Sequence, residues 1–308
     1  MSEVIGLLSG LLKLISSLFS TWETFKRRSK PQPQIPSSSP EAAADRFVRV
    51  FEAHGVRRSQ IPLFFNHDLT LASVKDNQSL LAVINDQLLN DAAKLFGVHP
   101  EWMYGATEKI YETHDFYKHP EEFSNFLQGL IGRSGKGSLE CYAIISDEIF
   151  WQHNNGFILI AEKVGEISGR PIFRYHLCDN LNFAYWKSHV DMYACLAIAY
   201  QHEVYPLGRV VSKDWMKKHV NGLSLFSYCD PDGIDILEVR RWCPDQAIEI
   251  PDQFLEGIDN EDRVHGRGHY LAIERWLSYC ADDRLKIYDA EFGPKALEAF
   301  KSKLALLS

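Results

Sequence analysis

The densest group of potential metal ligands in this chain lies between residues 265 and 274. His265 and His269 are four positions apart, and Glu274 follows on the same segment. Two histidines at this spacing on a helix, together with a carboxylate, form a common zinc-binding set. The glycines between the histidines disfavour a helix, and the HExxH order of zinc hydrolases is absent. We therefore expect a turn before a helix that starts near Tyr270, and neither a metal nor a cofactor.

Two further segments share composition, but not spacing, with ligand-binding loops. The glycine-rich segment 132–138 follows an expected helix and precedes an expected strand, which is the reverse of the order in a phosphate-binding loop. Segment 229–233 lacks the ligand series of a calcium loop. No GxSxG motif is present, so catalytic residues are not assigned, and an enzymatic role stays open but is disfavoured. Segment 186–189, Trp-Lys-Ser-His, is a candidate start of a ligand pocket.

The central part of the chain contains a helix-turn-helix pattern. Its parts are Ser59-Gln60 followed by Leu63, then Leu69-Thr70, and finally Phe-Gly-Val-His-Pro-Glu-Trp-Met-Tyr-Gly at 96–105. On these residues, segment 43–107 resembles the lambda-repressor-like (Cro-type) DNA-binding domain. The resemblance implies a helical bundle in which a short helix precedes a base-reading helix, with Leu63 at a core position.

The chain departs from the pattern of that family at three places. Pro62 lies inside the first short helix, where proline is tolerated only in the first turn. Phe64 stands where the family has a small residue, and Asn66-His67-Asp68 replace the expected glycine. Asn and Asp adopt the left-handed turn conformation more readily than most residues, so a turn is still expected there.

The resemblance implies contacts to double-stranded DNA, whereas the charge of the segment is unfavourable for them. Residues 43–107 contain six Lys/Arg and seven Asp/Glu, a net charge of −1, and the chain as a whole carries −8. DNA affinity depends largely on neutralising phosphates with basic side chains. A bundle used for protein contacts is therefore the alternative. The candidate DNA-binding residues are Arg57, Arg58, Ser59, Gln60, Thr70, Ser73 and Lys75.

The N-terminal segment 1–30 is expected to form an amphipathic helix. Its apolar residues fall within one half of a helical wheel between residues 4 and 25, and such a stripe needs a partner surface. A membrane surface, self-association into a homo-oligomer, and docking on the protein's own body are all compatible with this pattern. The Pro/Ser-rich linker at 31–42 favours the first two. The candidate contact residues are Leu8, Leu11, Leu12, Ile15, Phe19, Trp22, Lys26, Arg27 and Arg28.

Residues 138–308 are predicted to form a mixed α+β domain. A helical domain at 43–131 precedes it, and its trailing helix is expected at 107–131. Strands are expected at 139–146, 157–164, 172–177 and 234–241, and a short one at 247–250, which favours an antiparallel sheet. Helices are expected at 192–204, 270–280 and 295–307, with Ser212 capping another. Six widely spaced cysteines, mostly in apolar surroundings, predict free thiols in a reducing cytoplasm.

Together these patterns favour a bacterial-type cytoplasmic regulator, peripherally attached to a membrane if residues 1–30 bind lipid. It would bind or associate with DNA for transcription regulation and carry a C-terminal sensor or interaction domain. The alternative is an adaptor or effector that uses the helical bundle for protein contacts and the N-terminal helix for membrane association or self-assembly.

Overall fold

The computed structural model describes residues 40–147, 155–227, 240–259, 266–282, 285, 287 and 293–308. The chain divides into two compact units, Met1–Ser37 and Ser38–Ser308. The predicted amphipathic helix at 1–30, with all of its candidate contact residues, lies outside the described residues, as does most of the linker at 31–42. In the described part of the chain, no helix is long and apolar enough to cross a membrane.

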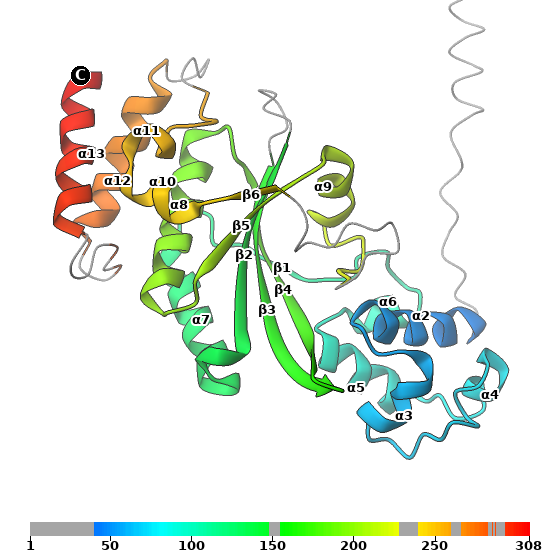
Figure 1. Cartoon of the computed structure of the whole chain (residues 1–308). Coiled ribbons are helices and arrows are strands. Elements are labelled where there is room, and N and C mark those ends of the chain that lie inside the picture. Colours follow the sequence, from blue (N-terminus) through cyan, green and yellow to red (C-terminus); the bar gives the residue numbers. More distant parts are fainter. Residues whose placement is uncertain are drawn as a thin grey trace, which may run out of the picture. The chain divides into compact units, whose positions relative to one another are not determined.

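The second unit confirms the α+β prediction: a six-stranded sheet is the middle layer between two groups of helices (Figure 1). The strand order is β1-β4-β3-β2-β5-β6. The prediction of an antiparallel sheet is wrong: the sheet is mixed, because β2 pairs with β5 and β1 with β4 in parallel, whereas the other neighbours pair antiparallel. The strands are β1 (Thr113–His114), β2 (Leu139–Ser146), β3 (Asn155–Ile167), β4 (Arg170–Asn182), β5 (Pro206–Val211) and β6 (Arg240–Trp242).

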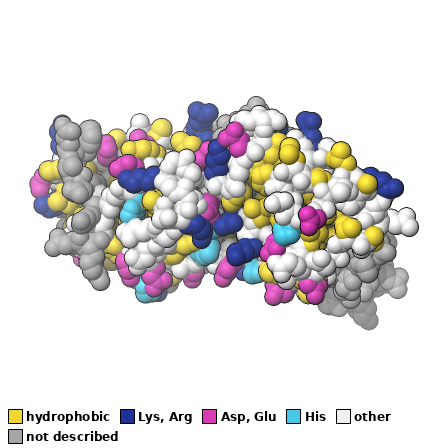
Figure 2. All heavy atoms as spheres, turned by 90° about the horizontal axis from the view of Figure 1, so that it is seen from below, with side chains coloured by type: hydrophobic (Ala, Val, Ile, Leu, Met, Phe, Trp, Pro, Cys, Tyr) yellow, Lys and Arg dark blue, Asp and Glu magenta, His cyan; other side chains and the backbone are white. Residues whose placement is uncertain are grey.

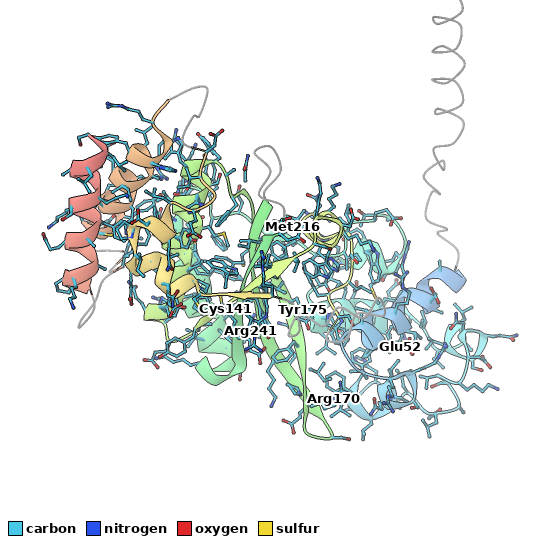
Figure 3. The ribbon with its side chains drawn as sticks, turned by 45° about the horizontal axis from the view of Figure 1, so that its top comes forward. Glu52, Cys141, Arg170, Tyr175, Met216 and Arg241 are labelled. Atoms are coloured by element: carbon cyan, nitrogen blue, oxygen red, sulfur yellow. The ribbon has the colours of Figure 1, made fainter. Side chains whose placement is uncertain are left out.

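Both faces of the sheet are buried, and successive residues of each strand serve opposite faces. Tyr142 and Ile144 of β2 belong to one apolar core, whereas Cys141 and Ala143 belong to the other. Cys141 and Tyr175 accordingly lie on opposite sides of the sheet (Figure 3). This explains why the central strands are almost continuously apolar in sequence.

The helical segment that precedes the sheet packs on one face, and we call it the helical layer. Its elements share a core with Phe157, Leu159 and Tyr175 of the sheet. Asp76 and Asn85 cap two of its helices by accepting hydrogen bonds from the amides of Ser79 and Leu88. The elements are α2 (Pro40–Ala53), η1 (Arg58–Gln60), α3 (Ile61–Phe64), α4 (Asn77–Leu81), α5 (Asp86–Phe96) and α6 (Pro100–Met103), and α9 (Lys213–His219) covers the same face.

The opposite face carries the remaining helices around the long buried helix α8. On the first face, Ser212 caps α9 as predicted, accepting a hydrogen bond from the amide of Trp215. The predicted strand at 247–250 is wrong, because Pro244 starts a helix there instead. The helices of this face are α7 (Pro120–Ser134), α8 (Trp186–Gln201), α10 (Pro244–Glu249), α11 (Pro251–Phe254), α12 (Gly268–Cys280) and α13 (Gly293–Leu307).

The predicted trailing helix at 107–131 is only half formed. Helix α7 begins at Pro120, and the preceding chain is extended, with Thr113 and His114 paired to β4. The expected boundary between residues 131 and 138 lies between α7 and β2, which share one apolar core. Residues on both sides of this boundary thus belong to a single compact unit.

Candidate functional site

Residues 70–76, which contain the candidate DNA-binding residues Thr70, Ser73 and Lys75, form a single turn. The Thr70 and Ser73 side chains each accept a hydrogen bond from the other residue's amide, at 3.2 and 2.9 Å. The Val74 amide then donates to the Thr70 carbonyl at 3.2 Å, which closes the turn. These side chains therefore use their oxygens locally, and the next helix, α4, begins only after the turn, at Asn77.

Arg58 holds this turn against the preceding short helix. Its Nε donates to the Val74 carbonyl oxygen at 2.8 Å, and a terminal nitrogen donates to Oδ1 of Asn77. Gln60 is also used locally, since its Oε1 accepts a hydrogen bond from the Arg57 amide at 3.0 Å. Sequence spacing cannot reveal that Arg58 is a structural clamp, because its partners lie sixteen and nineteen residues away.

The other predicted DNA-contacting residues are exposed or partly exposed. Arg57, Ser59 and Thr70 are exposed, and the Lys75 side chain is 65% exposed beside Asp76. On the face drawn in Figure 2, basic side chains are interspersed with acidic ones. The resemblance placed Leu63 in the core, but the structure leaves it 82% exposed, because α3 buries Ile61 instead. Leu71, in the turn, is 65% exposed as well.

A cavity of about 300 Å³ lies at one end of the sheet, where sequence patterns did not place a site. Ser146 ends β2, Val210 is near the end of β5, and Phe183 directly follows β4. These three strands run in the same direction, so their carboxyl ends meet at this edge. Ligands of sheets with parallel strands commonly bind outside such carboxyl ends.

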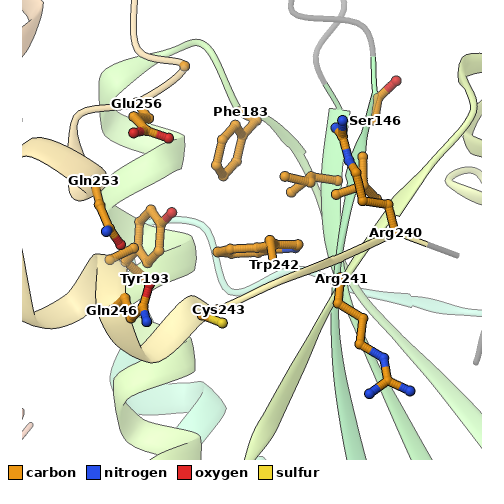
Figure 4. Close-up of a pocket in the computed structure, with 14 residues that line it drawn as sticks. Ser146, Phe183, Tyr193, Arg240, Arg241, Trp242, Cys243, Gln246, Gln253 and Glu256 are labelled. Carbon is orange, nitrogen blue, oxygen red and sulfur yellow. The ribbon is translucent and has the colours of Figure 1, made fainter.

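Aromatic rings form the middle of the cavity (Figure 4). Tyr193 of α8 meets Trp242 of β6 edge to face, with ring centroids 6.2 Å apart, and lies 6.2 Å from the ring of Phe183. The Trp242 indole is fixed by a 3.1 Å hydrogen bond from its Nε1 to the Ala143 carbonyl oxygen. Gly208 permits this approach, because a Cβ there would come within 2.1 Å of the Trp242 carbonyl oxygen.

Polar side chains of different chemistry stand on the two sides of these rings (Figure 4). Arg240 lies beside Ser146 on one side, whereas Arg241 extends away from the rings. Gln246 of α10, Gln253 of α11 and Glu256 stand on the other side. The arrangement suits a ring-bearing molecule with unlike polar groups at its ends.

The candidate pocket at 186–189 lies directly behind this cavity. His189 is buried, and its ring packs 4.3 Å from that of Phe183 and 4.7 Å from that of Tyr193. Its ring nitrogens lie 2.9 Å from the Phe183 carbonyl oxygen and 2.6 Å from that of Phe254. His189 thus supports the aromatic wall, and the residues that line the cavity begin one helical turn later, at Tyr193.

A buried carboxylate, Glu162 of β3, is the centre of a cluster of charged and polar side chains. Arg133 of α7 donates to both of its oxygens, at 2.9 and 2.8 Å, and Nε2 of His176 lies 2.8 Å from Oε2. Ser134 also donates to it, and Arg174 lies 3.4 Å away while donating to the Leu95 carbonyl oxygen of α5. Every carboxylate oxygen is engaged, so Glu162 joins layers and is not available as a base.

A second buried carboxylate, Asp191 of α8, is equally engaged. Arg275 of α12 donates to it at 2.7 and 3.0 Å, and the Tyr279 hydroxyl donates at 2.6 Å. The Lys118 amide donates to its other oxygen at 3.0 Å. Asp191 therefore anchors α12 and the turn before α7 to α8.

The predicted turn before residue 270 is compatible with the structure, in which α12 begins at Gly268. His265 lies outside the described residues, as does segment 229–233. Among the described residues, no group of three or more His, Cys, Asp or Glu side chains could hold a metal ion. Cys141, Cys178 and Cys195 are buried free thiols as expected, whereas Cys243 is exposed at the cavity.

Comparison with known proteins identifies no relative of this chain. No family model, curated protein or solved structure matches the chain. The cavity and the helical layer are therefore the two features of the chain that bear on its role.

Proposed function

We propose that the protein is a ligand-responsive regulator: its sheet binds a small molecule in the cavity, and its helical layer contacts a macromolecule. The cavity carries this proposal. It combines aromatic walls with a few polar groups at the carboxyl ends of three parallel strands, as small-molecule sites commonly do. Its volume of about 300 Å³ is enough for a compact ring-bearing molecule.

The sheet supplies a physical connection between the cavity and the helical layer. Strand β4 ends beside Phe183 in the cavity wall, and its Arg174 donates to the Leu95 carbonyl oxygen of α5. Tyr175 of the same strand belongs to the apolar core shared with α2–α6. A ligand that shifts the end of β4 would thereby change the position of the helical layer.

A test of the cavity uses phenol as a neutral ring probe and fills the cavity from α10. We expect saturation-transfer NMR to detect phenol binding to the full chain, and Gln246→Trp to abolish it. Glu249→Trp is the matched control, because Glu249 is exposed on the same helix but does not line the cavity. Phenol binding that is absent, or equal in both variants, would reject the cavity as a ligand site.

For the macromolecular partner, the geometry favours a protein surface. Residues 70–76 form a turn rather than a groove-reading helix, Arg58 is engaged internally, and Leu63 and Leu71 are exposed. Duplex DNA is the second candidate, supported by the exposed basic residues Arg57 and Lys75 and by the sequence resemblance. Membrane association and self-assembly through residues 1–30 are proposals from sequence alone.

The DNA candidate predicts different outcomes for two adjacent arginines. Arg57→Ala should weaken binding to duplexes of any sequence and lower the salt slope by about one, because an exposed arginine would contact phosphate. Arg58→Ala should instead reduce the free energy of unfolding by about 1–3 kcal/mol, because it leaves the Val74 carbonyl and the Asn77 amide without their donor.

Mobility-shift titrations at two salt concentrations and urea unfolding measure these two effects. Arg49→Ala is the control, since Arg49 is exposed on α2, away from the turn in sequence. If the unaltered protein binds no duplex at low ionic strength, the DNA candidate is excluded and the protein-contact role is favoured.

A further inference from the structure

Resting on the proposed role of the cavity, we infer its ligand class: a small planar aromatic molecule with an anionic group at one end and a hydrogen-bond donor, such as an amine, at the other. The cavity has three parts, arranged one after another in space, that match these features. They are Arg240 with Ser146, then the rings of Trp242, Phe183 and Tyr193, and then the side with Glu256 (Figure 4).

The anionic end is assigned to Arg240. Residues 240 and 242 alternate with 241 along β6, so Arg240 shares the Trp242 side of the strand and Arg241 faces the other way (Figure 4). Arg240 lies opposite Val210 of β5, and Val210 in turn pairs with Ile145, the residue before Ser146 at the end of β2. A guanidinium binds a carboxylate through two parallel hydrogen bonds, which gives both charge and orientation.

The planar part is assigned to the three rings. They come from three separate elements: the end of β4, helix α8 and strand β6. Trp242 is held by its hydrogen bond to Ala143, and Phe183 packs on the buried ring of His189. Rings that are already held in place can stack on a ligand ring without a further loss of side-chain freedom, which favours planar molecules over flexible chains.

The donor end is assigned to the side that carries Glu256, Gln246 and Gln253. An ionised carboxylate only accepts hydrogen bonds, and the two amides add further acceptor oxygens. A second anionic group on the ligand would meet the charge of Glu256 and be repelled. The cavity therefore discriminates between an amine and a carboxylate at this end of the ring.

Isothermal titration calorimetry of the full chain at pH 7 tests this polarity with molecules of matched size. We expect 4-aminobenzoate to bind more tightly than benzoate, and benzoate more tightly than phenol, with terephthalate weaker than 4-aminobenzoate. Arg240→Met should raise the dissociation constant of 4-aminobenzoate by about tenfold or more, as the loss of a charged hydrogen bond does. Phenol should be little affected.

Two matched variants make the result specific. Arg267→Met removes an exposed cation that does not line the cavity, and it should leave 4-aminobenzoate binding unchanged. Glu256→Gln should narrow the preference for 4-aminobenzoate over terephthalate. If phenol binds in the cavity but is as tight as 4-aminobenzoate, or if both arginine variants lose affinity equally, the ligand class is wrong while the cavity itself stands. If none of the probes binds, the proposed function fails first.

Discussion

Replacing Glu162 with Ala is expected to lower the free energy of unfolding by about 3–5 kcal/mol, the usual cost of removing one partner of a buried ion pair. The Glu162 side chain is 2% exposed, and it receives hydrogen bonds from Arg133, Ser134 and His176. Without it, Arg174 would stay largely buried with no counter-charge, at 18% exposure, and the His176 ring, at 12% exposure, would lose its hydrogen-bond partner. Urea unfolding of the two proteins measures the difference.

Glu166→Ala is the matched control on the same strand. Glu166 is half exposed and pairs with Lys163 at 2.7 Å, so its removal should cost less than about 1 kcal/mol. Glu162→Gln preserves the shape but removes the charge, and its cost should fall between the two. Equal stability of the Glu162→Ala and Glu166→Ala proteins would show that the cluster does not hold the layers together.

Acidification from pH 7 to pH 4 is expected to destabilise the fold. His54 alone should lower the free energy of unfolding by about 3 kcal/mol over this range. Burial lowers the pKa of His54 from 6.5 to about 4, against a hydrogen bond to the Val50 carbonyl oxygen that favours the charged form. Its Nδ1 lies 2.6 Å from that oxygen, and its Nε2 lies 3.4 Å from the Tyr111 hydroxyl. A neutral ring that donates from Nδ1 and accepts at Nε2 satisfies both contacts.

Between pH 6.5 and pH 4 the unfolded chain binds a proton at this position and the folded chain does not. Stability from His54 is therefore fully present above pH 6.5 and is lost as the pH falls through this window. Burial also lowers the pKa of His189 to about 4, although hydrogen bonds to the Phe183 and Phe254 carbonyls favour its charged form. His189 therefore adds to the stability that is lost on acidification. Burial raises the pKa of Glu162, but hydrogen bonds from His176, Arg133 and Ser134 outweigh it and hold the pKa below its ordinary value of 4.5. The stability from this carboxylate is therefore present above pH 4.5 and is lost only as the pH falls below that value.

Urea unfolding at several pH values between 7 and 4 measures this slope. His54→Phe should flatten it, even if the variant is less stable at pH 7, because the titrating ring is gone. A His54→Phe protein with the slope of the unaltered chain would show that His54 does not titrate in this window.

Local sequence signals were sufficient to predict several elements of the fold. The strand at 139–146 and the helix at 270–280 follow from apolar periodicity, and Ser212 caps its helix through the neighbouring Trp215 amide. The mixture of strands and helices after residue 138 was predicted on the same grounds, whereas the helical bundle at 43–107 was implied by the family resemblance. These signals depend on residues a few positions apart, which a sequence displays directly.

Contacts between segments that are distant in sequence could not be predicted in this way. Thr113 and His114 are extended because their backbone pairs with Leu177 and Cys178, although their own segment reads as helical. Arg58 is a clamp because Val74 and Asn77 lie beside it in space, and the resemblance could not distinguish that role from a phosphate contact. The cavity joins Ser146, Phe183, Tyr193, Trp242 and Glu256, which are spread over more than one hundred residues of sequence. No local pattern encodes such a site, because its geometry arises from the parallel pairing of β2 with β5 and from the close approach of β6 at Gly208.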